Sequence, residues 1–172
     1  ENQVCSAICC LHVVSPGTTP ILEDLFRGPG HLIMENMLIT RRVDFSASHV
    51  CRKPGASEEE NYALYGPAAN PHGHGHNYVL EVTLEGAPDP VTGMVYDLKA
   101  LKEVVNREVV DPLDHRFLNH EAPPFDQVIP TVENVAIEIW RRLAPHFNGT
   151  VRLANVRLYE TEDLFVDYAG RS

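Results

Sequence analysis

The chain has 172 residues, of which 44% are hydrophobic and 22% charged, the size and composition of one globular domain. Its formal net charge of -10 argues against nucleic acid as a partner, because neutralising phosphates requires a basic face. No stretch approaches the roughly 20 apolar residues of a membrane span, so we expect no membrane partner either.

Residues 1–36 show no sustained helical or strand period. We predict a poorly ordered N-terminal extension here, ahead of a domain over 37–172; the alternative is an arm that packs on that domain. The first residues lack the features of a signal peptide, and no arginine precedes Arg27, which argues against a mitochondrial presequence. Three of the four cysteines lie in the first ten residues, without a zinc-ribbon pattern, which favours a reducing, cytoplasmic compartment.

The first half of the domain reads as two strands around a long loop. A strand pattern begins at Leu38 and continues toward His49, and a second covers 77–85. Residues 51–71, rich in Pro, Gly, Ala and Glu, read as a loop, and loops of this length in compact domains are usually functional.

The second half reads as two helices and two strands. We predict a helix over 98–110 that Asp97 caps and Pro112 ends, and another over 132–143 that Thr131 caps. Closing strands are expected over 151–161 and 164–168. The resulting order, ββααββ, predicts an α+β fold with an antiparallel sheet.

Histidines alternate with glycines in the segment that opens the second strand. His74 and His76 point to one face of an extended chain, and His49 supplies a third nitrogen if the two strands pair. Three histidines with an open position form the pattern of a catalytic zinc site. The alternative is an exposed, flexible histidine-rich turn that binds metal only adventitiously.

Six sequence blocks in order resemble the 6-pyruvoyltetrahydropterin synthase family, which includes the bacterial 6-carboxytetrahydropterin synthases. The blocks are Phe45-Ser46-Ala47-Ser48-His49, Asn70 to Tyr78, Asp89-Pro90-x-Thr92-Gly93-Met94-Val95, Pro112-Leu113-Asp114-His115, Thr131-x-Glu133-Asn134-Val135 and Tyr159-Glu160-Thr161. The resemblance implies the tunnelling fold, with a four-stranded antiparallel sheet, two helices on one face, and trimers stacked into a homohexamer with active sites at subunit interfaces. It also implies Zn2+ on His49, His74 and His76.

The resemblance also implies roles for five further residues. Asp114 and His115 fall where the family places an acid/base relay, and a carboxylate suits this role because it raises the basicity of a histidine. Glu160 falls where the family anchors the pterin, and its carboxylate can accept two N–H bonds from the pyrimidinone edge. Thr131 and Glu133 match a segment that lines the pterin pocket.

One departure concerns the family's catalytic cysteine, which precedes the paired histidines. The two positions where relatives carry it hold Ala68 and Asn70, neither of which can act as a thiolate base. Three replacements remain open: Cys51, which shares a strand face with His49; one of the loop glutamates; and His72. The loop glutamates are Glu58, Glu59 and Glu60.

The sequence therefore predicts a zinc-dependent lyase that converts 7,8-dihydroneopterin triphosphate to a 6-substituted tetrahydropterin. The alternatives are a 6-carboxytetrahydropterin synthase or another enzyme that cleaves a dihydropterin side chain, and a zinc- and pterin-binding homologue with impaired catalysis. The sequence does not choose between the tetrahydrobiopterin, queuosine and folate pathways.

Overall fold

A computed structural model describes residues 35–170 of the chain. The predicted extension therefore lies outside the described residues, except for its last two positions. Within the described residues, the first regular element is strand β1, which begins at Met37. No helix within 35–170 is long and apolar enough to cross a membrane.

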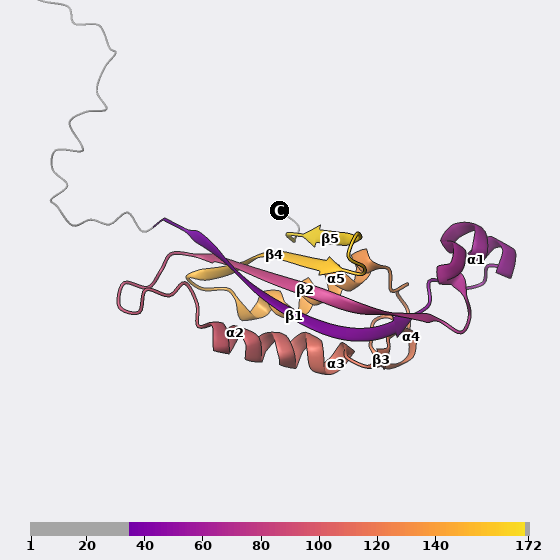
Figure 1. Ribbon diagram of the computed structural model, residues 1–172, viewed down its shortest axis with the longest axis horizontal. Helices are drawn as coiled ribbons and strands as arrows, with labels where there is room; N and C mark the ends of the chain where they lie inside the picture. The colour runs from indigo at the N-terminus through magenta and orange to yellow at the C-terminus, as the bar shows by residue number, and fades with distance from the viewer. Residues whose placement is uncertain (1–34, 171–172) are drawn as a thin grey trace, which may run out of the picture. The chain divides into compact units, whose positions relative to one another are not determined.

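A five-stranded sheet carries the fold, in the order β3-β1-β2-β4-β5 (Figure 1). All neighbours pair antiparallel except β3, which runs parallel to β1. The strands are β1 (Met37–His49), β2 (His74–Gly86), β3 (Arg116–Phe117), β4 (Val151–Tyr159) and β5 (Phe165–Tyr168). The α+β class and the four predicted antiparallel strands are confirmed, and β3 is an addition.

The helices lie in the connections between the strands. They are α1 (Glu58–Tyr65), η2 (Gly66–Ala69), α2 (Leu98–Val105), the π-helical turn η3 (Asn106–Val110), α3 (Asp111–Leu113), α4 (Leu118–Glu121), α5 (Val132–Leu143) and η4 (Ala144–His146). Asp97 and Thr131 cap α2 and α5 as predicted, each accepting backbone N–H bonds at the helix start.

One face of the sheet forms the core with α2 and α5. Along β2, every second residue from Tyr78 to Gly86 is buried, which is the period of a strand with one covered face. Tyr78, Leu80 and Leu158 are fully buried and join Leu101 and Ile139 from the helices in one apolar cluster. Each such side chain stabilises the fold by roughly 1.5–3 kcal/mol.

Two predictions about helices were wrong. The segment 51–71 is not all loop, because Ser57 and Glu60 form a reciprocal capping box that starts α1. Pro112 does not end the helix that begins at Leu98, which continues to Leu113. Here the Asp111 N–H bonds back to the Asn106 carbonyl, five residues earlier, and this wider turn admits the proline ring, which would clash in a regular α-helix.

Candidate metal and substrate site

The register of β1 and β2 brings the three predicted histidines together. His49 pairs with His74, and Ala47 pairs with His76, so all three imidazoles lie on the buried face of the sheet. One ring nitrogen from each lies within 4.8 Å of the other two, a spacing that can hold a metal ion. The histidines thus form a compact cluster where the two long strands meet.

Burial favours the neutral form of His49 and His74. His49 is 1% exposed, and its burial lowers its pKa to about 4. The hydrogen bond to the Pro130 carbonyl opposes this shift, and the neighbouring His74 and His76 add to it. Burial, followed by the charge of His76, also lowers the pKa of His74. Neutral imidazole is the form that binds metals, so His49 and His74 need little deprotonation to act as ligands.

A backbone carbonyl fixes the tautomer of His49. Its Nδ1 lies 2.6 Å from the Pro130 oxygen, which can only accept, so Nδ1 carries the proton and Nε2 keeps its lone pair. The loop that presents this carbonyl is held at the start of α5, where the Asn134 amide donates to the Ile129 oxygen at 2.9 Å. Metal-binding histidines commonly have such an outer partner.

The residues present fit a metal. Among residues 35–170, three buried imidazole nitrogens lack a hydrogen-bond partner: His49 Nε2, His74 Nδ1 and His76 Nε2. Buried polar atoms without partners are uncommon in folded proteins, and three converging nitrogens of this kind suit a divalent ion that favours nitrogen ligands.

Glu160 borders the histidine cluster from the turn that follows β4. Its Oε1 lies 3.5 Å from His49 Nε2 and 3.7 Å from His76 Nε2. Of the other two predicted substrate residues, Thr131 caps α5, and Glu133 is an exposed residue in the first turn of that helix. The structure thus brings Glu160 next to the predicted metal ligands and leaves Glu133 at the surface.

Cys51 is a buried free thiol beside the cluster. Its Sγ lies 4.0 Å from the Pro130 oxygen, the same acceptor that His49 uses. Burial, and then the charges of Glu160 and Glu133, raise the pKa of Cys51 to about 11. The thiol is therefore close to the predicted ligands and protonated at neutral pH.

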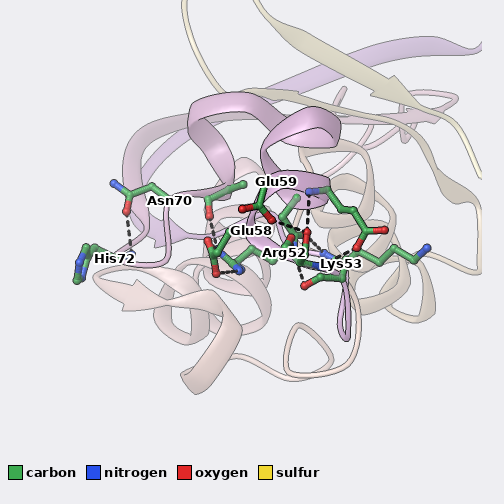
Figure 2. A network of polar contacts seen from close by, with 11 residues as sticks. Arg52, Lys53, Glu58, Glu59, Asn70 and His72 are labelled. Atoms are coloured by element: carbon green, nitrogen blue, oxygen red, sulfur yellow. Dashed lines mark hydrogen bonds and ion pairs between the residues drawn. The ribbon is translucent and has the colours of Figure 1, made fainter.

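A polar network holds the segment that carries Ala68 (Figure 2). The Cys51 N–H donates to the Ala68 carbonyl at 2.9 Å, and Arg52 Nη1 donates to the Ala69 carbonyl at 2.9 Å. Arg52 also forms an ion pair with Glu58. Position 68 is therefore the direct neighbour of Cys51 across a backbone hydrogen bond.

The other candidate bases are engaged elsewhere or exposed. Glu58 pairs with Arg52, Glu59 accepts from the Ser57 hydroxyl at 2.8 Å, and Glu60 accepts from the Ser57 N–H at 2.7 Å. All three lie in the first turn of α1, where negative charge is favourable. His72 is exposed, and its backbone N–H donates to the Asn70 side chain at 3.1 Å (Figure 2).

Asp114 and His115 form a pair at the edge of the sheet. Asp114 Oδ2 lies 2.8 Å from His115 Nδ1, and Oδ1 accepts the Ser46 N–H at 2.8 Å. The Ser46 bond, with His115 as a further cause, lowers the pKa of Asp114, so the carboxylate is ionised. The His115 side chain is 82% exposed and shares the lining of a hollow of about 360 Å³ with His76.

Asn119 is a site residue that the sequence did not indicate. Its side chain accepts the Val50 N–H at 2.9 Å and donates to the Val50 carbonyl at 3.0 Å. Both bonds fix the chain between His49 and Cys51. A lone asparagine in a helical turn carries no pattern that predicts such a contact, because the partner lies 69 residues away.

Comparison with known proteins identifies the family of the chain. The family model described as 6-pyruvoyl tetrahydropterin synthase matches residues 38–171. A 6-pyruvoyl tetrahydrobiopterin synthase of Pongo abelii is 45% identical over 132 residues, which cover 77% of this chain and 90% of that protein. A 6-carboxy-5,6,7,8-tetrahydropterin synthase of Rickettsia bellii is 28% identical over 145 residues, covering 74% of this chain and 96% of the relative.

Structural comparison gives the same result. The solved 6-pyruvoyl tetrahydropterin synthase of Caenorhabditis elegans matches with a TM-score of 0.75 and 36% identity, over 80% of this chain and 98% of that one. The family model covers most of the chain, and the similarity extends over nearly the whole length of these relatives. The chain belongs to the 6-pyruvoyl tetrahydropterin synthase family.

Proposed function

We propose that this protein is a zinc-dependent lyase that acts on 7,8-dihydroneopterin triphosphate and forms a 6-substituted tetrahydropterin. The observation that carries the proposal is the convergence of three histidine nitrogens within 4.8 Å, with the Glu160 carboxylate 3.5 Å from one imidazole. The names of the relatives support the same substrate class, and the 45% and 28% identities favour the pyruvoyl-forming over the carboxy-forming branch.

In this proposal His49, His74 and His76 hold the zinc. A zinc ion with three protein ligands and an open position acidifies and orients hydroxyl groups that bind to it. The Pro130 carbonyl keeps the His49 lone pair on Nε2, the nitrogen that borders Glu160.

Glu160 is the proposed pterin anchor. It is the carboxylate nearest the histidines, and an ionised carboxylate accepts two parallel N–H bonds from a 2-amino-pyrimidinone edge. We propose supporting roles in the pocket for Thr131 and Glu133, on the grounds that they open the helix whose preceding loop contacts His49.

His115 and Cys51 are the proposed proton-transfer groups. Asp114 orients the His115 ring with the proton on Nδ1, which leaves Nε2 free to accept or donate a proton. Cys51 is the candidate base that lies beside the histidines, next to the position that carries the cysteine in relatives. A cation at the histidines favours the thiolate, because an adjacent positive charge lowers a thiol pKa.

We also propose that the protein is a cytoplasmic homohexamer built from two trimers. Between Met37 and Phe45, β1 pairs on one side only among the described residues, since β3 covers just Ala47 and Ser48. A long unpaired edge favours association with another strand. The free thiol of Cys51 supports a reducing compartment.

A second candidate function is favoured by Ala68: a zinc- and pterin-binding homologue that does not turn over. The retained Asp114–His115 pair favours the enzyme, because a binding protein has no need of an oriented proton carrier.

The test is incubation of the zinc-loaded protein with 7,8-dihydroneopterin triphosphate, followed by identification of the products by mass spectrometry. We expect release of triphosphate and formation of a 6-pyruvoyl product. A 6-carboxy product would favour the alternative enzyme, and tight pterin binding without any product would favour the binding homologue.

A further inference from the structure

Tyr78 has a buried hydroxyl without a hydrogen bond. The residue is 0% exposed, and its ring stacks on Phe45 at 5.0 Å between centroids. Among residues 35–170, its hydroxyl oxygen has no hydrogen-bond partner. Buried tyrosine hydroxyls usually have a hydrogen-bond partner. The packing of the core does not explain why the Tyr78 hydroxyl is buried without one.

The strand register brings Tyr78 next to Glu160. Val79 pairs with Tyr159, so Glu160, one residue past the end of β4, follows opposite Tyr78. His76 precedes Tyr78 by two residues on the same face, with 5.6 Å between the ring centroids. The orphaned hydroxyl therefore belongs to the same cluster as the carboxylate that borders His49 and His76.

The hydroxyl is a donor at neutral pH. A phenol has an ordinary pKa of about 10 and therefore keeps its proton at neutral pH. An ionised carboxylate offers about four acceptor positions, so Glu160 can accept one bond from a phenol while two remain for a ligand edge.

We propose that Tyr78 is a positioning residue for Glu160: when a dihydropterin binds, the Tyr78 hydroxyl donates a hydrogen bond to the carboxylate and holds it in the orientation that receives the two N–H groups of the ligand. This inference rests on the proposed function of Glu160 as the pterin anchor. It assigns a role to a residue that neither the zinc ligands nor the proton-transfer groups account for.

The substitution Tyr78→Phe tests this directly, because it removes only the oxygen. In the free protein the hydroxyl makes no hydrogen bond, so the melting temperature should stay unchanged or rise. Binding of 7,8-dihydroneopterin, followed by calorimetry, should weaken about 10-fold to 100-fold, the range for loss of a bond to a charged group. Tyr96→Phe, at a half-buried ring that packs on Phe147, is the matched control and should bind normally.

A double-mutant cycle with Glu160→Gln separates the proposed role from direct ligand contact. If the hydroxyl acts through Glu160, adding Tyr78→Phe to Glu160→Gln should weaken binding no further. A full additional loss, unchanged binding in Tyr78→Phe alone, or a melting temperature several degrees lower in that variant would each overturn the inference. A wild-type protein that binds no 7,8-dihydroneopterin would overturn the proposed function as well.

Discussion

Ala68 and Cys51 are neighbouring residues in the structure, joined by a backbone hydrogen bond. The position of the family's cysteine holds Ala68, and the Cys51 N–H donates to the Ala68 carbonyl at 2.9 Å. The residue that carries the thiol is therefore hydrogen-bonded directly to position 68 through the backbone. If Cys51 has taken over proton abstraction, the reaction needs no other base from the loop.

The substitution Cys51→Ala should lower the turnover number at least about 100-fold, the usual contribution of a positioned base. Adding Ala68→Cys should restore part of that loss, because it returns a thiol to the position that relatives use. Ala63→Cys in the Cys51→Ala background, at an exposed position of α1, is the control and should restore none. Steady-state kinetics on the zinc-loaded variants checks all three, and full activity in Cys51→Ala would exclude Cys51 as the base.

The sequence predicted the histidine cluster because its ligands obey strand geometry. His74 and His76 are two residues apart, and the register of two long strands places His49 opposite His74. The Pro130 carbonyl and the Asn119 amide could not be predicted in this way. A backbone carbonyl has no residue signature, and the Asn119 contact spans 69 residues with no periodic pattern.

At the scale of elements, the end of β1 depends on one side chain. Asn119 satisfies both the N–H and the C=O of Val50, between a proposed zinc ligand and the proposed base. The side chain thus replaces the hydrogen bonds that a neighbouring strand would make, because the pairing of β3 with β1 ends at Ser48.

We expect Asn119→Ala to lower the free energy of unfolding by about 1–3 kcal/mol, because two partly buried backbone groups lose their partner. It should also weaken zinc binding, measured by competition with a chromophoric chelator, since the chain beside His49 is less constrained. Asn148→Ala, at an exposed position, should change neither quantity. A destabilised variant with wild-type zinc affinity would show that the two hydrogen bonds between Asn119 and Val50 serve stability alone.

Helix α1 depends on a buried asparagine more than on its exposed ion pair. Asn61 Oδ1 accepts the Lys53 N–H at 2.7 Å, and its amide donates to the carbonyls of Ala56 and Ser57. Asn61→Ala should therefore increase hydrogen exchange across residues 53–70. Glu58→Gln removes the exposed pair with Arg52 and should leave exchange almost unchanged. Equal exchange in both variants would contradict this assignment.

The sequence contained a signal for α1 that composition obscured. Ser57 and Glu60 have the spacing of a capping box, whereas the surrounding Pro, Gly and Ala residues favoured a loop. Strand β3 had no such signal, because two residues are too short to show a period. Its pairing arises from the turn at Asp114 and His115, which is bonded twice to Ser46. The His115 N–H donates to the Ser46 carbonyl, and the Asp114 side chain accepts the Ser46 N–H.

At the scale of the whole molecule, the exposed Asp114–His115 pair and the open edge of β1 both favour assembly. His115 is 82% exposed, although an acid/base group works best where water is excluded. Most of β1 has a free edge among the described residues. Contact with a second subunit would cover both features.

Light scattering on the purified protein should therefore give about six times the 19.2 kDa mass of the chain. Substitution of Leu38 by proline on the open edge of β1 should lower that mass, because proline removes a donor and blocks pairing there. Glu162→Pro, in the exposed turn before β5, serves as the control for proline itself. A wild-type mass of one chain would contradict the predicted assembly.

The most direct test of the account is the metal content of the purified protein, measured by plasma mass spectrometry. We predict about one zinc per chain in the wild type and a strong loss in His74→Ala, with no comparable loss in His72→Ala, where the exposed histidine lies outside the cluster. A wild type without zinc after gentle purification, or full retention of zinc in His74→Ala, would contradict the central claim that these three histidines form the metal site.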